Sequence, residues 1–315
     1  MPDDVHPQVQ AMLDKIAEAG IPKVQDLTPQ AARELVENLA RARLESYPPP
    51  EVASVEERST GAGYNHVPVR IYRASADKNA PVVVFYHGGG HVFGSLDSHD
   101  TMARMICRQA GCTVVSADYR MGPEHPFPAA VEDAYQAARW VADNAAKLRV
   151  DPGRLVVCGD SAGGNLSTVV ALMARDSGDF AIAAQVLVYP VVDYRGGRPS
   201  HARYGKGYGI LEAETVEWFL HHYIGDGDAG DWRAAPIEAN SLEGLPPAFV
   251  LTAECDVLND EGVAYAARLR NAGVEVEHID YAGMIHGFFG YLGLLDDTDR
   301  AHADVGAYLK RVWSA

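Results

Sequence analysis

The pentapeptide Gly-Asp-Ser-Ala-Gly at 159–163 constrains this chain more than any other segment. It follows an apolar run, 154–158, that is typical of a buried strand, and it precedes a small-residue run, 164–173, that is typical of a helix. A sharp strand-to-helix turn needs glycine on both sides of the serine, because larger side chains would collide there. Such a turn exposes the Ser161 hydroxyl at the end of a sheet, as a nucleophile requires. The alternative is a tight turn whose serine does no chemistry.

Strand-like and helix-like runs alternate along most of the chain. Runs typical of strands occupy 52–58, 66–73, 81–86, 113–117, 154–158, 184–189, 248–252 and 274–281. Helical patterns occupy 98–110, 128–146, the segment after Ser161, 260–272 and 297–313. The first two strand-like runs alternate as an antiparallel pair does. The pattern as a whole predicts an α/β fold, with a mostly parallel sheet covered by helices on both faces.

Two segments depart from this alternation. Residues 1–46 carry amphipathic helical patterns, and residues 191–240 are glycine-rich and then aromatic. An insertion this long between two core strands is often a lid or a binding loop. We therefore expect 1–46 to form an N-terminal helical cap segment and 191–240 a cap insertion. The core is then divided between 47–190 and 241–315.

Composition excludes several classes of partner. The formal charge of −16 repels phosphate backbones and anionic lipid, so we expect neither nucleic acid nor a membrane as a partner. No apolar run approaches the roughly 20 residues that span a bilayer, and the N-terminus does not resemble a signal peptide. The four cysteines lack metal-ligand spacing. We predict a cytoplasmic protein with buried free thiols and no metal.

A second glycine motif, His87 followed by glycines at 88–90, comes directly after the apolar run 81–86. Three consecutive glycines leave backbone N–H groups free to face a ligand, as a developing oxyanion requires. The Ala162 amide, directly after the serine, would supply a further donor. The alternative is a flexible turn, but the later serine motif favours catalysis. We interpret His87 as a structural residue that holds this loop.

A serine nucleophile needs a base, which in sheets of this kind follows the acid along the chain. His286 lies in the segment 282–287, just past the last predicted strand, where catalytic groups are favoured. His278 falls within that strand and His302 within the terminal helix, so we expect surface or packing roles for both. His286 is the predicted base.

The acid must orient the imidazole and stabilise its protonated form. Asp256 comes soon after the predicted strand 248–252, at the same edge of the sheet. Asp260 has the position of a first-turn helix residue, where a carboxylate suits the helix dipole, and Asp280 falls within a strand. We therefore predict Asp256 as the acid.

Together these motifs resemble the hormone-sensitive-lipase-like branch of the α/β-hydrolases, the family IV bacterial esterases. The matching segments are His87–Gly90, Asp118–Glu124, Phe127–Asp133, Gly159–Gly164, Asp256–Gly262 and His286–Phe288. The resemblance implies the α/β-hydrolase fold with a helical cap. It implies a catalytic triad of Ser161, Asp256 and His286. It also implies an oxyanion hole made by the amides of Gly88, Gly89 and Ala162. One departure is Val257, where the family usually has proline.

The resemblance further implies a serine esterase that acts on short or medium acyl esters and needs no cofactor. It implies that Arg120 and Glu124 are scaffold residues that pair with one another. The best pocket candidates are Phe93, Tyr208 and Phe219. For each of these aromatic residues, simple packing of the cap onto the core is the alternative. Relatives often dimerise through the last strand, which favours a homodimer.

Two other functions use the same motifs. An amidase or peptidase could have the same triad, because only the leaving group differs. A ligand-binding receptor without turnover is a second alternative, but receptors of this family have lost the triad histidine, whereas His286 is present. The sequence therefore favours an esterase that acts on a small-molecule ester.

Overall fold

The computed structural model describes residues 5–314, and their strands form a single sheet in the order β1-β2-β4-β3-β5-β6-β7-β8. The strands are β1 (Ser54–Ser59), β2 (Pro68–Arg73), β3 (Ala80–Tyr86), β4 (Thr113–Ala117), β5 (Val150–Asp160), β6 (Ala184–Val188), β7 (Ala248–Cys255) and β8 (Val276–Ile285). β2 pairs antiparallel with β1 and β4, and the other neighbours pair in parallel. The α/β fold with a mostly parallel sheet is therefore confirmed.

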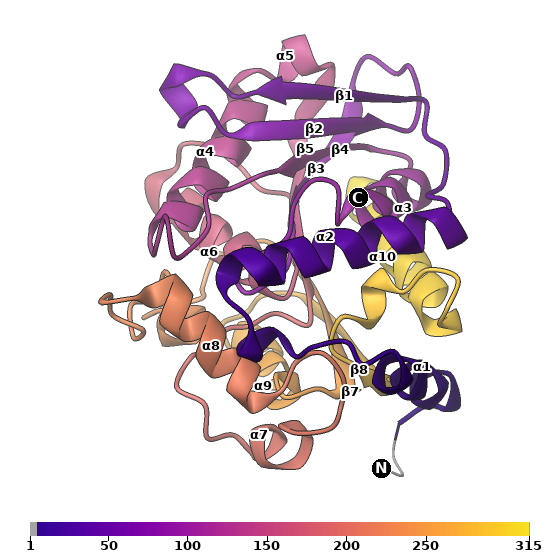
Figure 1. Cartoon of the computed structure of the whole chain (residues 1–315). Coiled ribbons are helices and arrows are strands. Elements are labelled where there is room, and N and C mark those ends of the chain that lie inside the picture. The colour runs from indigo at the N-terminus through magenta and orange to yellow at the C-terminus, as the bar shows by residue number, and fades with distance from the viewer. Residues whose placement is uncertain (1–4, 315) are drawn as a thin grey trace.

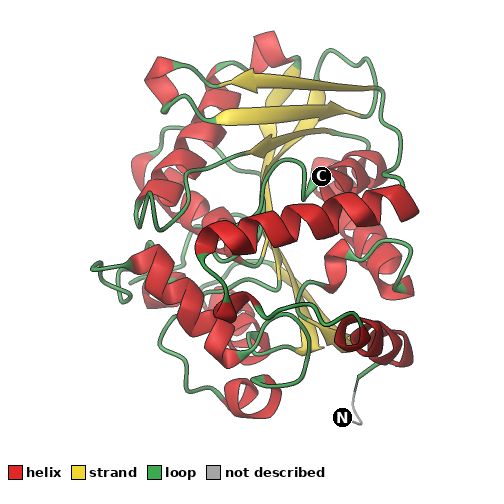
Figure 2. Cartoon of the chain, viewed as in Figure 1, coloured by secondary structure: helices red, strands yellow, loops and turns green. Residues whose placement is uncertain are grey.

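Helices cover both faces of this sheet (Figures 1 and 2). They are α1 (Pro7–Glu18), α2 (Pro29–Ser46), α3 (Asp100–Ala110), α4 (Ala129–Asp143), α5 (Ala145–Leu148), α6 (Ala162–Ser177), α7 (Pro199–Tyr204), α8 (Ala213–Ile224), α9 (Asn259–Asn271) and α10 (Asp296–Ser314). Alternate β3 residues point to opposite faces: Val82 and Val84 pack with α4 and α6, whereas Val83 and Phe85 pack with α3 and α10. Burial on both faces explains why the run 81–86 is apolar throughout.

The last two strands are longer than their apolar runs. β7 continues to Cys255 and β8 continues to Ile285, whereas the sequence predicts ends at 252 and 281. The register shifts between Ala253 and Cys255, so that Cys255 pairs with Ile285. Asp256 and His286 therefore each follow directly on a strand end, at the same edge of the sheet. As predicted, β8 is an edge strand; dimerisation through it stays a prediction.

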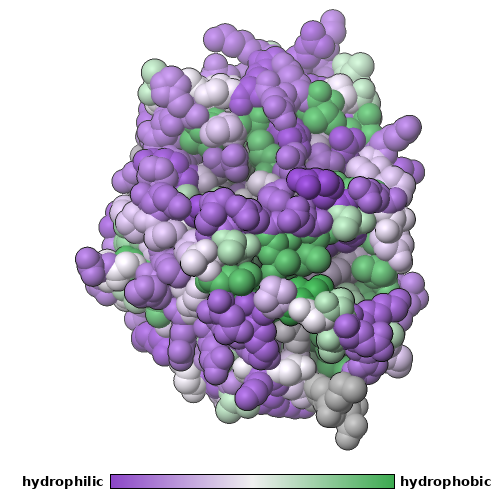
Figure 3. Space-filling model, viewed as in Figure 1, coloured by the Kyte–Doolittle hydropathy of each residue, from purple (hydrophilic) through white to green (hydrophobic). Residues whose placement is uncertain are grey.

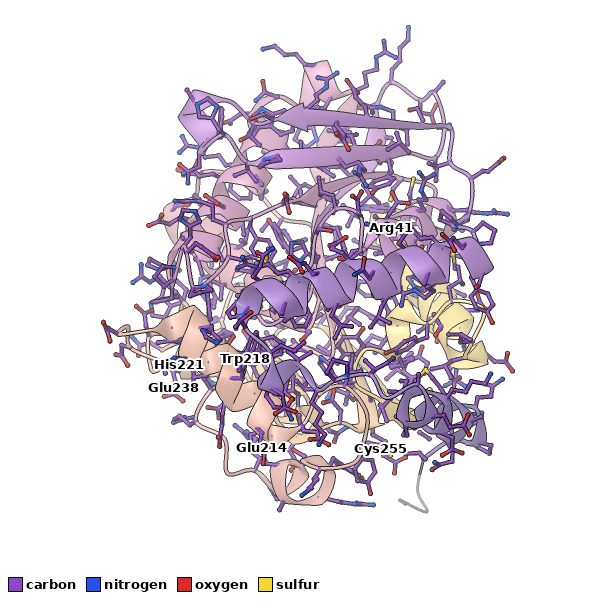
Figure 4. All side chains as sticks on the ribbon, viewed as in Figure 1. Arg41, Glu214, Trp218, His221, Glu238 and Cys255 are labelled. Carbon is purple, nitrogen blue, oxygen red and sulfur yellow. The ribbon has the colours of Figure 1, made fainter. Side chains whose placement is uncertain are left out.

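The N-terminal segment and the later insertion lie against each other. Figure 1 shows α2 crossing the middle of the molecule, with α8 below it. Lys23 Nζ lies 2.6 Å from Glu212 Oε2 at the start of α8. That helix also carries Trp218 and His221, both labelled in Figure 4. The predicted boundaries of the cap and the core stay a prediction.

The expected pairing of Arg120 with Glu124 is wrong. Arg120 Nε donates to the buried carboxylate of Asp133 at 2.8 Å, and the Arg120 amide donates to the same carboxylate at 3.0 Å. Glu124 pairs with Arg33 of α2 at 2.6 Å. Arg33 also donates to the Val92 carbonyl at 2.8 Å, so it fastens α2 to the loop that follows the three glycines.

Two further predictions bear on the chain as a whole. None of the four cysteines is in a disulfide, and all four are buried, as predicted. Within residues 5–314, no helix has both the length and the apolar character needed to cross a membrane. Location in the cytoplasm stays a prediction.

Candidate active site

Ser161 occupies a strained turn between β5 and α6. Its backbone has φ 54° and ψ −115°, a conformation that non-glycine residues rarely adopt and that clusters at functional sites. A Cβ on Gly159 would lie 2.6 Å from the Tyr86 carbonyl oxygen of β3. A Cβ on Gly163 would lie 2.6 Å from the Tyr86 carbonyl carbon and still closer to its oxygen. The turn therefore requires glycine on both sides because it packs directly on the β3 backbone.

Three predicted side chains form a continuous hydrogen-bonded series. Ser161 Oγ lies 2.9 Å from His286 Nε2, and His286 Nδ1 lies 2.6 Å from Asp256 Oδ2. The Asp256 side chain is fully buried, and His286 is only 8% exposed. A hydroxyl bonded to an imidazole, which is bonded in turn to a buried carboxylate, is the arrangement that activates a serine nucleophile.

The turn that carries Asp256 is held by hydrogen bonds at the point where the family usually has proline. The other carboxylate oxygen of Asp256, Oδ1, accepts a hydrogen bond from the Leu258 amide at 2.9 Å. Ser200 Oγ donates to the Val257 carbonyl at 2.8 Å. Valine at 257 thus leaves the carboxylate fixed.

The glycine loop is anchored by a buried histidine. His87 Nδ1 lies 2.8 Å from the Gly88 carbonyl oxygen, and the His87 ring stacks on Tyr119 with centroids 4.3 Å apart. The Tyr119 hydroxyl donates to the His87 carbonyl at 2.7 Å. Burial lowers the pKa of His87 to about 3, so the ring is neutral and can donate one hydrogen bond to Gly88. These contacts fit the structural role predicted for His87.

The amides of the glycine loop differ in what they bind. The Gly88 amide donates to Asp160 Oδ1 at 2.9 Å, so it already has a buried carboxylate as its acceptor. Within residues 5–314, no hydrogen bond is donated by the amides of Gly89, Gly90 or Ala162. The sequence analysis predicts Gly88 and Gly89 as oxyanion donors on this loop. The hydrogen bond from the Gly88 amide to Asp160 argues against Gly88. Gly90 is then the second candidate beside Gly89.

Two of the three pocket candidates lie beside the glycine loop. The rings of Phe93 and Phe219 have centroids 5.2 Å apart, and a Cβ on Gly90 would lie 2.5 Å from Phe219 Cε1. Tyr208 packs instead against Tyr204, with ring centroids 5.0 Å apart. That these aromatic residues line a substrate pocket stays a prediction.

Sequence reasoning missed three residues around the site. Ile210 is 48% exposed, and its Cδ1 lies 3.1 Å from the position of a Cβ on Gly287, next to His286. Its place in the glycine-rich insertion was the only signal. The other two residues are Asp160 and His99. His99 precedes α3 as its N-cap residue, and its Nε2 lies 3.7 Å from Asp160 Oδ2.

The histidines rejected as the base have other contacts. His302 is buried, with Nε2 3.0 Å from the Phe289 carbonyl oxygen and its ring stacked on that of Phe289. His278 Nε2 lies 2.9 Å from Thr252 Oγ1. Across the described part of the chain, no group of three or more histidine, cysteine, aspartate or glutamate side chains could hold a metal ion.

Comparisons with known proteins agree on one family. A family model described as the α/β-hydrolase fold matches residues 83–290. The carboxylesterase NlhH of Mycobacterium tuberculosis is 42% identical over 287 residues, which cover 88% of this chain and 90% of that protein. Ethyl acetate hydrolase of Pseudomonas putida is 41% identical over 238 residues, 74% of each chain. The solved structure of a hyperthermophilic esterase from the archaeon Pyrobaculum calidifontis is 40% identical, with a TM-score of 0.93 and 100% of both chains covered. This chain therefore belongs to the α/β-hydrolase family, in its hormone-sensitive-lipase-like branch.

Proposed function

We propose that this protein hydrolyses carboxylic esters with short or medium acyl chains, by transferring the acyl group to Ser161 and then to water. The coarser activity, carboxylic ester hydrolysis, rests on relatives named carboxylesterase and ethyl acetate hydrolase at 41–42% identity. The observation that carries the finer proposal is the hydrogen-bonded series of Ser161, His286 and Asp256.

In the first step, Ser161 Oγ attacks the ester carbonyl carbon while His286 Nε2 takes the hydroxyl proton. This transfer requires His286 to carry its other proton on Nδ1, and the Asp256 carboxylate 2.6 Å away favours that tautomer. The same carboxylate stabilises the imidazolium once it forms. Burial of Asp256 strengthens this interaction because little water screens it.

The carbonyl oxygen becomes negatively charged in this step and needs hydrogen-bond donors. The amides of Gly89, Gly90 and Ala162 are our candidates, because they have no acceptor among the described residues. Donors fixed in place before the reaction stabilise the tetrahedral oxyanion without further rearrangement, and each is worth about 10² to 10³ in rate in known enzymes.

In the steps that follow, His286 acts first as an acid and then again as a base. His286 gives its proton to the leaving alcohol oxygen as the carbon–oxygen bond breaks, which leaves the acyl group on Ser161. His286 then takes a proton from water, whose oxygen attacks the acyl-enzyme. Collapse of the second tetrahedral intermediate releases the acid and returns the proton to Ser161.

Apolar groups around the site favour an apolar acyl or alcohol group. Phe93 and Phe219 lie at the glycine loop, and Ile210 lies beside Gly287. Figure 3 shows an apolar area on this side of the molecule, below α2 and framed by polar surface. Such surroundings suit small uncharged esters.

The test is Ser161→Ala, assayed with p-nitrophenyl esters from two to twelve carbons and with a fluorophosphonate label. We expect a loss of about 10⁶ in kcat and no labelling. Ser177→Ala, at the other end of α6, is the control and should behave as wild type. Labelling or turnover that survives in Ser161→Ala would refute the nucleophile. Faster turnover of matched p-nitroanilides would favour an amidase.

A further inference from the structure

The carboxylate directly before the nucleophile has no part in the mechanism above. Asp160 is 5% exposed, and its two oxygens bind different segments. Oδ1 accepts from the Gly88 amide at 2.9 Å, and Oδ2 lies 3.7 Å from His99 Nε2. A Cβ on Gly88 would lie 3.0 Å from Asp160 Cγ and still closer to Oδ2. Glycine at 88 is therefore what lets the loop approach this carboxylate.

Asp160 stays ionised in this buried position. Burial opposes the charged form, but His99 and the hydrogen bond from the Gly88 amide outweigh it and hold the pKa of Asp160 below its ordinary value. The bond to Gly88 is therefore charge-assisted, and such bonds are roughly twice as strong as neutral ones. It joins the end of β5 to the loop that follows β3.

His99 is itself held by a series of polar contacts. Its Nδ1 lies 2.9 Å from Ser98 Oγ, which accepts from the Ser95 amide at 2.8 Å. Ser95 Oγ donates to Glu37 Oε1 of α2 at 2.6 Å. This series of contacts thus connects α2 to Asp160, the residue directly before Ser161.

We propose that Asp160 and His99 are positioning residues that lock the glycine loop against the nucleophile turn. The two ends of Gly88 are fixed separately: its amide by Asp160, and its carbonyl oxygen by His87. Because both the amide and the carbonyl group of Gly88 are held, the amides of Gly89 and Gly90 that follow are held in a fixed orientation. This inference rests on the proposed function, in which those amides bind the oxyanion.

A trifluoromethyl ketone inhibitor reports on these amides. Ser161 Oγ adds to the ketone carbon, His286 takes the serine proton, and the resulting hemiketal oxygen carries the negative charge that the amides must stabilise. We expect Asp160→Ala to lower kcat by about 10², since misplacement by about an ångström costs that much. The inhibition constant should rise by a similar factor, while KM changes little.

Two further variants keep the inference testable if Asp160→Ala does not fold. Asp160→Asn retains an oxygen that can accept from Gly88, so it should recover most of kcat and of inhibitor affinity. His99→Gln leaves Asp160 without its ring partner and should change both quantities in the same direction as Asp160→Ala, but less. Wild-type values of both quantities in Asp160→Ala or in His99→Gln would overturn the inference.

Asp133→Asn is the matched control, because Asp133 is another buried carboxylate whose hydrogen bonds go to Arg120 and Asn65 and not to the glycine loop. It should lower the melting temperature without raising the inhibition constant relative to KM. If it raises that constant as much as Asp160→Ala does, general loosening explains both and the positioning role fails. Failure of the proposed function would look different, because wild-type turnover would then survive in Ser161→Ala.

Discussion

Gly163→Ala should destabilise this protein, although it places a better helix former in α6. In an isolated helix the substitution stabilises by about 1 kcal/mol. Here the added Cβ would lie 2.6 Å from the Tyr86 carbonyl carbon, 2.9 Å from the His87 oxygen and closer still to the Tyr86 oxygen. All three atoms belong to the backbone at the end of β3, which is bonded on both sides, to β4 and β5. Neither the strand nor the helix can move aside freely.

The size of the effect follows from these contacts. Overpacking a core with one extra methyl group costs about 1–3 kcal/mol, and contact with a central strand backbone places this case at the upper end. After the gain in helix propensity, a net loss of about 2 kcal/mol remains. At about 2 °C per kcal/mol, the melting temperature falls by about 4 °C. Displacing the strand end also displaces His87 and Gly88, which we expect to lower kcat by about 10².

Urea unfolding followed by fluorescence, together with kcat on p-nitrophenyl acetate, measures both effects. Gly63→Ala is the control, because a Cβ there meets no atom within 4 Å and its φ is not positive. It should leave the unfolding midpoint and kcat close to wild type. If Gly163→Ala unfolds at the wild-type urea concentration and keeps its kcat, close backbone approach is not the reason for glycine in this turn.

Two other predictions concern acid stability and chain length. Burial lowers the pKa of His87, His91 and His302 to about 3, so the unfolded chain binds protons below about pH 6.5 that the folded chain does not. Stability should then fall by about 1.4 kcal/mol per pH unit for each histidine as the pH drops from about 6.5 toward 3, and equal urea midpoints at pH 7 and pH 5 would contradict this. Phe219→Ala should shift the preferred p-nitrophenyl ester to longer chains, because it vacates the space beside Gly90. The adjacent Trp218→Ala should keep the wild-type preference, and an unchanged preference in Phe219→Ala would exclude Phe219 from the pocket.

The fold is largely readable from the sequence because its strands are buried on both faces. Continuous apolar runs such as 81–86 indicate strands buried on both faces, because helical patterns separate one run from the next. The ends of β7 and β8 could not be read in this way. Their last residues include Glu254 and Gly283, which do not look like strand residues, and a register shift between Ala253 and Cys255 carries the pairing on to Ile285. The residues at which β7 and β8 end are therefore set by pairing within the sheet and not by amino-acid composition.

The three side chains of the candidate triad could also be proposed from the sequence, because each follows a strand that can be located from its composition. The residues that surround the site could not be predicted in this way. Ile210 and Phe219 come from an insertion with no regular pattern, and only folding brings them beside Gly287 and Gly90. A residue in such a segment gives no sign of which part of the core it will contact.

Gly88 shows most clearly what the sequence alone cannot predict about the site. From the sequence, three consecutive glycines offer three equivalent amides, and nothing distinguishes the first from the others. The difference arises because parallel pairing of β3 with β5 places Gly159 opposite Tyr86. That register brings the next residue on β5, Asp160, within 2.9 Å of the Gly88 amide. A buried carboxylate needs hydrogen-bond donors, and the Gly88 amide supplies one of them. The carboxylate that gives the Gly88 amide a buried acceptor is therefore the same one that we propose as the anchor of this loop.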